Sequence, residues 1–351
     1  MPLTLPSLPT LGRSALGRLK RLATVAPTSP KVTIGLDIGS SAVKAVGLGP
    51  HSGGRRSVLG ATRASIAEPT EAAIQAAIQE AVHGLRAPMS TVNLSISGQA
   101  VIMRVIEMPK LEPHELKQAL PFEAQRYLPF QLQDVVLDGA IVGSVDNQKN
   151  QVLIVACRRD ALEQRLACVT KAGLHPGLVD VDALTVVNAW NEHADGQARH
   201  STYDVVHVGA QWTNLAIIKD SQPLLVRDIP WGDQKLFKQM AEQLGRTEDA
   251  VADSLHQASG AIPTDLADAM RAGCEALAAD LQLSFDFFEN HFGAPPAQVA
   301  LSGGLALCPG IVEALTQHLA QPLLTWEPRQ GLGTDMAVAY GLALRTDVAP
   351  R

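Results

Sequence analysis

Two stretches of this chain share one design, and that repetition constrains the fold more than any other feature. In each, an apolar run ends in a short polar turn with a glycine, and a second apolar run follows. They are KVTIGLDIGSSAVKAVGL at residues 31–48 and YDVVHVGAQWTNLAIIKD at residues 203–220. Apolar runs joined by such a turn are typical of β-hairpins. The repeated design predicts two related halves, each starting with a hairpin.

Composition predicts an ordinary globular chain of more than one domain. The 351 residues exceed the usual size of a single core. A hydrophobic content of 46% argues against disorder, and a net charge of -6 argues against a general nucleic-acid binder. The four cysteines form no CxxC pair, so we expect buried free thiols. No apolar run is long enough to span a membrane.

The segment 100–175 predicts a compact β-α-β-β-α unit. AVIMRVIEM reads as a strand, and the following helix has Pro113 near its start and Pro129 near its stop. VVLDGAIVGS and NQVLIVACR read as two further strands, and the second helix closes at Gly173. This unit is large enough to fold as an inserted subdomain.

The remaining pattern divides the chain into five predicted parts. They are a flexible basic leader (1–30), a first lobe (31–99 and 176–200), the inserted subdomain (100–175), a second lobe (201–232 and 297–351) and a mostly helical part of that lobe (233–296). The leader carries Arg13, Arg18, Lys20 and Arg21 and no acid. It reads either as a disordered segment or as a weak membrane-surface helix.

Three glycine turns stand at strand ends and have the parts of a phosphate-binding site. They are Asp37-Ile38-Gly39-Ser40-Ser41, Gly209-Ala210-Gln211-Trp212-Thr213 and Ser302-Gly303-Gly304. Consecutive backbone N–H groups with a hydroxyl bind anions, and an aspartate beside a phosphate suits Mg²⁺ held through water. Lys44 adds a positive charge nearby. For each turn alone, a plain hairpin or strand-to-helix joint is the more ordinary interpretation, and the three turns in this order carry the prediction together. No GxxxxGK[ST] or GxGxxG motif occurs.

These turns, in this order around two similar halves, resemble the actin-like ATPase superfamily. Within it the chain resembles the type IV pilus assembly protein PilM family, with FtsA a more distant relative. The stretches that carry this resemblance are GLDIGSSAVKAV, LPFEAQRYLPF, VDVDALTVVNAW, LSFDFFENHF and LSGGLALCPGIVEAL. The match runs over roughly residues 31–345, and the segment Phe122–Phe130 is its most family-specific part.

The resemblance implies a two-lobed α/β fold, actin-like (ribonuclease H-like), with ATP and Mg²⁺ between the lobes. Its nucleotide-binding residues would be Asp37, Gly39, Ser40, Ser41, Lys44, Gly209, Thr213, Asp280, Gly303 and Gly304. Asp37 would hold Mg²⁺ through water, and Asp37 and Asp182 would be the catalytic acids.

The resemblance also implies a partner. The inserted subdomain would help to bind the N-terminal cytoplasmic tail of PilN, an inner-membrane pilus protein, with Leu128, Pro129 and Phe130 as a wall of the groove. The chain would then act as a cytoplasmic scaffold at the inner-membrane face, attached through this partner or through its basic leader. It would contact other pilus machinery, and self-association stays open.

Three departures from the family pattern predict inefficient ATP turnover and weakened nucleotide binding. His207 stands where the second turn usually begins with an aspartate, and Mg²⁺ prefers oxygen ligands. Trp212 occupies a normally small turn position, and Leu283 replaces a basic residue. A half-buried strand histidine satisfied by a neighbour is the plainer interpretation of His207.

Three functions therefore stay open at this point. The first is the scaffold, with ATP as a structural ligand. The second is an active ATPase or small-molecule kinase, which would need an acid in both turns. The third is an FtsA-like filament protein, for which the closing residues LRTDVAPR offer no amphipathic membrane helix. Fold similarity alone does not decide among them.

Overall fold

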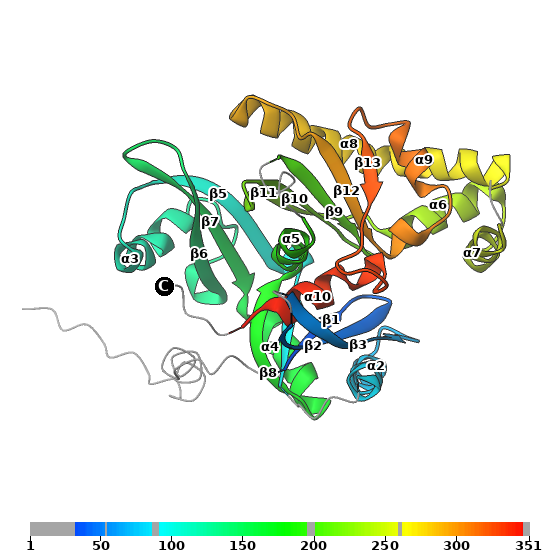
Figure 1. Ribbon diagram of the computed structural model, residues 1–351, viewed down its shortest axis with the longest axis horizontal. Coiled ribbons are helices and arrows are strands. Elements are labelled where there is room, and N and C mark those ends of the chain that lie inside the picture. Colours follow the sequence, from blue (N-terminus) through cyan, green and yellow to red (C-terminus); the bar gives the residue numbers. More distant parts are fainter. Residues whose placement is uncertain (1–31, 53–54, 86–90, 195–200, 259–261, 347–351) are drawn as a thin grey trace, which may run out of the picture.

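A computed structural model describes residues 32–52, 55–85, 91–194, 201–258 and 262–346, so the predicted leader lies outside the described residues. One five-stranded sheet has the order β3-β2-β1-β4-β8 (Figure 1). Its strands are β1 (Thr33–Ile38), β2 (Ala42–Ser52), β3 (Arg55–Ser65), β4 (Thr91–Ile96) and β8 (His175–Val181). The helix α2 (Glu71–Gly84) packs on it and is capped by Thr70. We call this sheet with α2 the first lobe.

A second five-stranded sheet repeats the first, with the order β11-β10-β9-β12-β13. Its strands are β9 (Tyr203–Val208), β10 (Thr213–Lys219), β11 (Gln222–Ile229), β12 (Gln298–Gly303) and β13 (Leu323–Thr325). In both sheets the first three strands pair antiparallel and the last two pair parallel. The predicted duplication is thus confirmed at the level of strand order and direction.

Four helices cover the outer face of the second sheet, and together they form the second lobe. They are α6 (Asp233–Leu244), α7 (Glu248–Gln257), α8 (Thr264–Phe292) and α9 (Ile311–Thr316). Gly245 and Gly293 end α6 and α8 in the left-handed conformation, with φ of 63° and 80°. The helices α6, α7 and α8 make the described residues of the segment 233–296 mostly helical, as expected.

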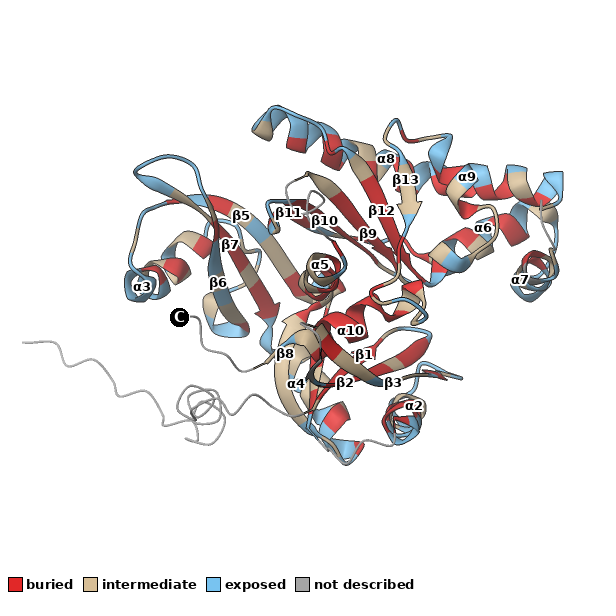
Figure 2. Ribbon diagram, in the orientation of Figure 1, coloured by how far each residue is buried: buried red, intermediate tan, exposed pale blue. Residues whose placement is uncertain are grey.

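Two helices lie between the sheets and join the lobes, α5 (Asp182–His193) and α10 (Ala337–Leu344) (Figure 1). They share one apolar core with strands of both sheets, and Figure 2 shows α10 buried along its length. The helices touch through their backbones, because a Cβ on Gly341 would lie 1.9 Å from the carbonyl oxygen of Thr185. Small residues at this crossing therefore set how the two halves meet.

The predicted β-α-β-β-α order of the inserted segment is confirmed. Its elements are β5 (Val101–Pro109), α3 (Pro113–Ala124), β6 (Val135–Ser144), β7 (Lys149–Arg158) and α4 (Arg159–Lys171). The strands form their own antiparallel sheet, β5-β7-β6, and α3 packs on it; we call these four elements the insert. Val169 of α4 and the adjacent Ala172 pack instead in the first lobe's core. Because α4 packs on the first lobe, the predicted boundaries of the inserted subdomain at residues 100 and 175 remain a proposal.

The whole is a mixed α/β protein with the two-lobed actin-like architecture. Within the described ranges, no helix has both the length and the hydropathy that crossing a bilayer requires.

Candidate functional site

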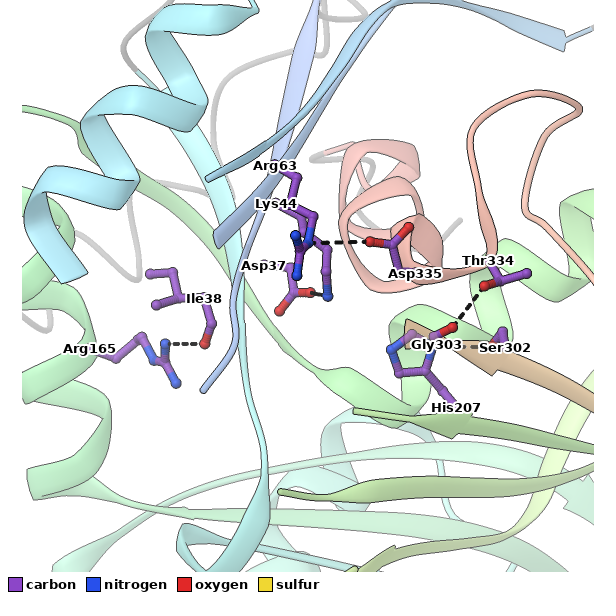
Figure 3. Close-up of polar contacts among 10 residues, drawn as sticks. All are labelled: Asp37, Ile38, Lys44, Arg63, Arg165, His207, Ser302, Gly303, Thr334 and Asp335. Carbon is purple, nitrogen blue, oxygen red and sulfur yellow. Dashed lines mark hydrogen bonds and ion pairs between the residues drawn. The ribbon is translucent and has the colours of Figure 1, made fainter. Parts of the chain in front are cut away.

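The first glycine turn joins β1 to β2 and is exposed at its tip. The N–H of Gly39 closes the hairpin on the carbonyl three residues later, at 3.1 Å. Ser40 and Ser41 at the tip are exposed. Arg165 of α4 donates to the carbonyl oxygen of Ile38 at 2.8 Å (Figure 3). The turn is therefore braced by a helix from the inserted segment, and its two serines face solvent.

Asp37 and Lys44 are directly opposite each other on β1 and β2. The Nζ of Lys44 lies 3.2 Å from Oδ2 of Asp37 (Figure 3). Both side chains are largely buried, at 7% exposure for Asp37 and 14% for Lys44. Each charge is thus compensated by the other.

The second turn joins β9 to β10 and is closed by the N–H of Gly209, which donates to the Trp212 carbonyl at 2.9 Å. The start of α6 holds the turn, since the N–H of Asp233 donates back to the carbonyl of Gly209 at 3.0 Å. Thr213 is fully buried, and its hydroxyl donates to the carbonyl of Trp231 at 2.7 Å. Backbone hydrogen bonds hold the turn, but the hydroxyl of Thr213 is engaged inside the lobe.

His207 is buried on β9 beside the third turn. Its Nδ1 lies 3.0 Å from the hydroxyl of Ser302 (Figure 3). Burial, followed by the charge of Lys44, lowers the pKa of His207 to about 4, against the opposing charge of Asp37. The side chain is therefore neutral at pH 7 and held by a neighbour, which is the plainer of the two sequence-based interpretations.

The third turn follows β12 and approaches β9 closely. Gly303 has φ of 99°, and a Cβ there would lie 2.1 Å from the carbonyl oxygen of Val208. Its own carbonyl accepts a hydrogen bond from the hydroxyl of Thr334 at 2.7 Å (Figure 3). Gly304 is exposed. Only glycine fits at 303, and the exposed backbone at 304 is open to a ligand.

The carboxylates of Asp37 and Asp182 interact electrostatically. Asp182 is the first residue of α5. Burial, and next the charge of Asp37, raises the pKa of Asp182 to about 6. The two predicted acids thus belong to one electrostatic unit between the lobes.

The sequence analysis missed a third acid, Asp233 at the start of α6. Its Oδ2 would lie 3.6 Å from a Cβ on Gly304. Burial raises its pKa to about 6, although the charge of Lys44 opposes this rise. The only local sign of it is the Gly232-Asp233 pair after β11, and the fold brings that pair beside Gly304.

The interlobe site is the group formed by these side chains and turns. Within the described segments, no three His, Cys, Asp or Glu side chains are arranged to hold a metal ion by themselves. Exposed turn serines, the open backbone at Gly304 and the nearby Lys44 fit a polyphosphate. With neutral His207 in place of an acid, Mg²⁺ would depend on water and phosphate oxygens for most of its ligands.

Asp280 and Leu283 lie on α8, and the structure does not bring them to the turns by any described contact. The carbonyl of Asp280 accepts a hydrogen bond from Ser284, whose hydroxyl accepts another from Arg227. Leu283 is 64% exposed. The proposed nucleotide contact of Asp280 therefore has no geometric support here.

The three candidate partner-binding residues follow α3 and differ in exposure. Leu128 packs against the core of the insert, whereas Pro129 is exposed. Phe130 is half-buried, with the guanidinium of Arg158 5.9 Å from its ring centroid. The most exposed aromatic residue of this region is instead Phe122, at 74%.

Comparison with known proteins agrees with this architecture. A chain of the PilM–PilN type IV pilus biogenesis complex is 26% identical, with a TM-score of 0.77 over 91% of this chain and 99% of that chain. The ethanolamine utilization protein EutJ from Carboxydothermus hydrogenoformans is 15% identical, with a TM-score of 0.54 over 94% and 96% of the two chains. A diol dehydratase-reactivating factor is 11% identical, with a TM-score of 0.52 over 90% and 99%. The last two show the fold alone.

The family comparison assigns the chain directly. The model of the type IV pilus assembly protein PilM family matches residues 35–347, which include both lobes, the insert and all three glycine turns. Together with the duplicated sheets and the inserted three-stranded sheet, this match identifies the chain as a member of the type IV pilus assembly protein PilM family.

Proposed function

We propose that this protein is a scaffold of a type IV pilus or related secretion machine, acting at the cytoplasmic face of the inner membrane. It binds the N-terminal tail of a PilN-like membrane protein and links it to the rest of the machinery. The observation that carries this proposal is the similarity, over nearly the whole chain, to a protein solved in a PilM–PilN complex. Membership of a pilus assembly family supports the same role.

The insert has the features that capture of an extended peptide requires. β5 and β6 are the outer strands of its sheet, and an outer strand can pair with an added peptide strand. Ile141 of β6 is 45% exposed and lies on the same face of the strand as Leu137, which packs on the insert core. Phe122 and Tyr127 are also exposed nearby in the chain, at 74% and 38%. We infer that the tail lies between the insert and the first lobe.

ATP is the structural ligand in this proposal. The turn with Ser40 and Ser41 and the side chain of Lys44 would bind phosphate groups from the first lobe. The backbone at Gly209 and Gly304 would contact the ligand from the second lobe. Bound Mg-ATP would supply a charged bridge between the lobes, and Asp37 would orient the water around the metal.

We expect no efficient ATP turnover because His207 stands at the second turn in place of an acid. A neutral imidazole that is hydrogen-bonded to Ser302 offers no carboxylate oxygen at the second turn.

One observation favours the alternative of an active ATPase. Asp182 has its pKa raised to about 6, which is close to the value that suits a general base at neutral pH.

Backbone amide shifts measured by NMR test the scaffold role. The full chain, labelled with ¹⁵N, is titrated with a peptide of the partner's N-terminal tail and with a scrambled peptide of the same composition. We expect the tail peptide to shift amides of residues 100–175 and of the adjoining first lobe. A complete lack of shifts in residues 100–175 would exclude the proposed site.

A further inference from the structure

Three charged residues form a row across the first three strands of the first sheet. Asp37 of β1 is directly opposite Lys44 of β2, and Lys44 is directly opposite Arg63 of β3. Residues that are directly opposite on neighbouring strands point to the same face of a sheet. Val46 and Leu48, on the same face as Lys44, pack in the core that the two sheets share. The row therefore points toward the second lobe.

Two cations side by side are unusual on a sheet, because like charges directly opposite each other destabilise strand pairing. The chain compensates Lys44 with Asp37, at 3.2 Å. It compensates Arg63 differently, since Oδ2 of Asp335, just before α10, lies 3.8 Å from its Nε (Figure 3). The carboxylate of Asp233 also interacts electrostatically with Lys44 and with Arg63, so it is a further acid of this group. The row is thus balanced mainly by acids outside β2 and β3.

Arg63 is the most exposed of the three residues in the row, and its ion pair is the longer one. Its side chain is 52% exposed, whereas that of Asp335 is 13% exposed. The distance of 3.8 Å is an ion pair and is too long for a hydrogen bond. A long pair without a hydrogen bond, in which the guanidinium is half exposed, contributes little to stability, so a stronger anion can replace the carboxylate. A phosphate group is such an anion, because it accepts two parallel N–H bonds from a guanidinium.

We propose that Arg63 is a further polyphosphate-binding residue of the interlobe site and that Asp335 is the partner it leaves when the ligand binds. The phosphate groups exchange the Arg63–Asp335 ion pair for an Arg63–phosphate contact beside Lys44. Asp335 therefore competes with the ligand, and binding of a polyphosphate releases Asp335 at the start of α10. This inference rests on the proposed binding of ATP between the lobes.

Calorimetric titration of the full chain tests the exchange, with Mg-ATP in one series and magnesium tripolyphosphate in the other. Arg63→Ala should weaken the binding of both ligands by about tenfold, the effect of losing one charged hydrogen bond. Asp335→Asn, which keeps the side-chain shape, should tighten both by about threefold to fivefold. In an Arg63→Ala background, Asp335→Asn should bring no gain.

The matched control is Glu192→Gln. It removes another ion pair of β3, between Arg55 and Glu192, which has a distance of 4.0 Å and similar exposure. This variant should bind both ligands as the unmodified chain does.

Three outcomes would overturn the proposal. Unchanged affinity in Asp335→Asn and Arg63→Ala would show that neither residue meets the phosphates. A gain in Asp335→Asn that persists without Arg63 would show simple charge repulsion instead of exchange. No binding of either ligand by any variant would refute both the exchange and the nucleotide role, and the separate tail-peptide titration would still decide the scaffold role.

Discussion

The indole ring of Trp212 lies against Gly98, and this contact joins the second lobe to the first. Gly98 follows β4 with φ of 76°, and a Cβ there would lie 2.8 Å from Cε2 of Trp212. The N–H of Gly98 donates to Oδ2 of Asp228 on β11 at 2.7 Å. Asn214 donates to the other oxygen of Asp228 at 2.8 Å. The lobes therefore touch beside the second turn.

Gly98→Ala should open this contact. The new methyl group meets the indole ring, and overpacking of this kind costs about 1–3 kcal/mol beyond the backbone strain of a positive φ. Chemical denaturation gives the loss of stability, and tryptophan fluorescence reports the environment of Trp212. Gly173→Ala is the control, because φ is 86° there and an added Cβ would meet nothing within 4 Å. Equal losses in both variants would show that the indole contact does not matter.

Asp204→Asn should stabilise the protein at neutral pH. Asp204 is fully buried on β9, and among the described residues neither of its carboxylate oxygens has a hydrogen-bond partner. Burial raises its pKa well above the ordinary value. Because the folded chain binds this proton more tightly than the unfolded chain, stability falls as pH rises above about 4, by at most about 1.4 kcal/mol per pH unit. Asparagine removes this loss.

Urea denaturation at a series of pH values measures the effect of Asp204→Asn. The advantage of the variant should be near zero at about pH 4 and should grow to at least about 1 kcal/mol at pH 7. Asp253→Asn, on the exposed side of α7, is the control and should show no such growth. An advantage that is independent of pH would mean that ionisation of Asp204 is not its source.

His207→Asp should tighten Mg-ATP binding and weaken the ligand-free protein. The new carboxylate supplies an oxygen ligand at the second turn, but it also adds a negative charge near Asp37. We expect affinity for Mg-ATP to rise by about tenfold, and the melting temperature without ligand to fall. Calorimetry and thermal denaturation measure both effects. An unchanged affinity would mean that another residue, for example Trp212, is what weakens nucleotide binding.

Phe122→Ala should weaken binding of the partner's tail peptide. Phe122 is 74% exposed on α3, and truncation of an aromatic side chain that contacts a peptide costs about 1–2 kcal/mol, or about tenfold in affinity. Fluorescence anisotropy with a labelled peptide measures this change. Phe287→Ala on α8 removes another exposed phenylalanine, of 52% exposure, and should bind normally. Equal binding by all three proteins would exclude Phe122 from the peptide site.

The sequence predicted the parts of the fold that depend on local pattern. Alternation around Gly39 and Gly209 indicated the two hairpins, and the structure confirms both. The glycine at 173 marked the end of α4, where φ is 86°. These features are visible in sequence because a hairpin or a helix end is decided by neighbouring residues.

The interlobe contacts were beyond this kind of prediction. Arg63 and Asp335 meet only because β3 and the start of α10 are brought together by packing across the whole chain. Asp233 reaches Gly304 for the same reason. The helix before Pro129 ends at Ala124, earlier than the position of that proline suggested, and it contains Pro121 in its interior. No local pattern contains such long-range pairings.

The most direct test of the central claim, that this protein is a scaffold and not a motor, is a calorimetric titration with Mg-ATP and a parallel assay of phosphate release. For a scaffold we expect binding of Mg-ATP with phosphate release far below about 1 per second, the lower end for typical enzymes. Turnover at or above about that rate would contradict it. It would mean that Asp37 and Asp182 suffice for hydrolysis despite the neutral histidine at position 207.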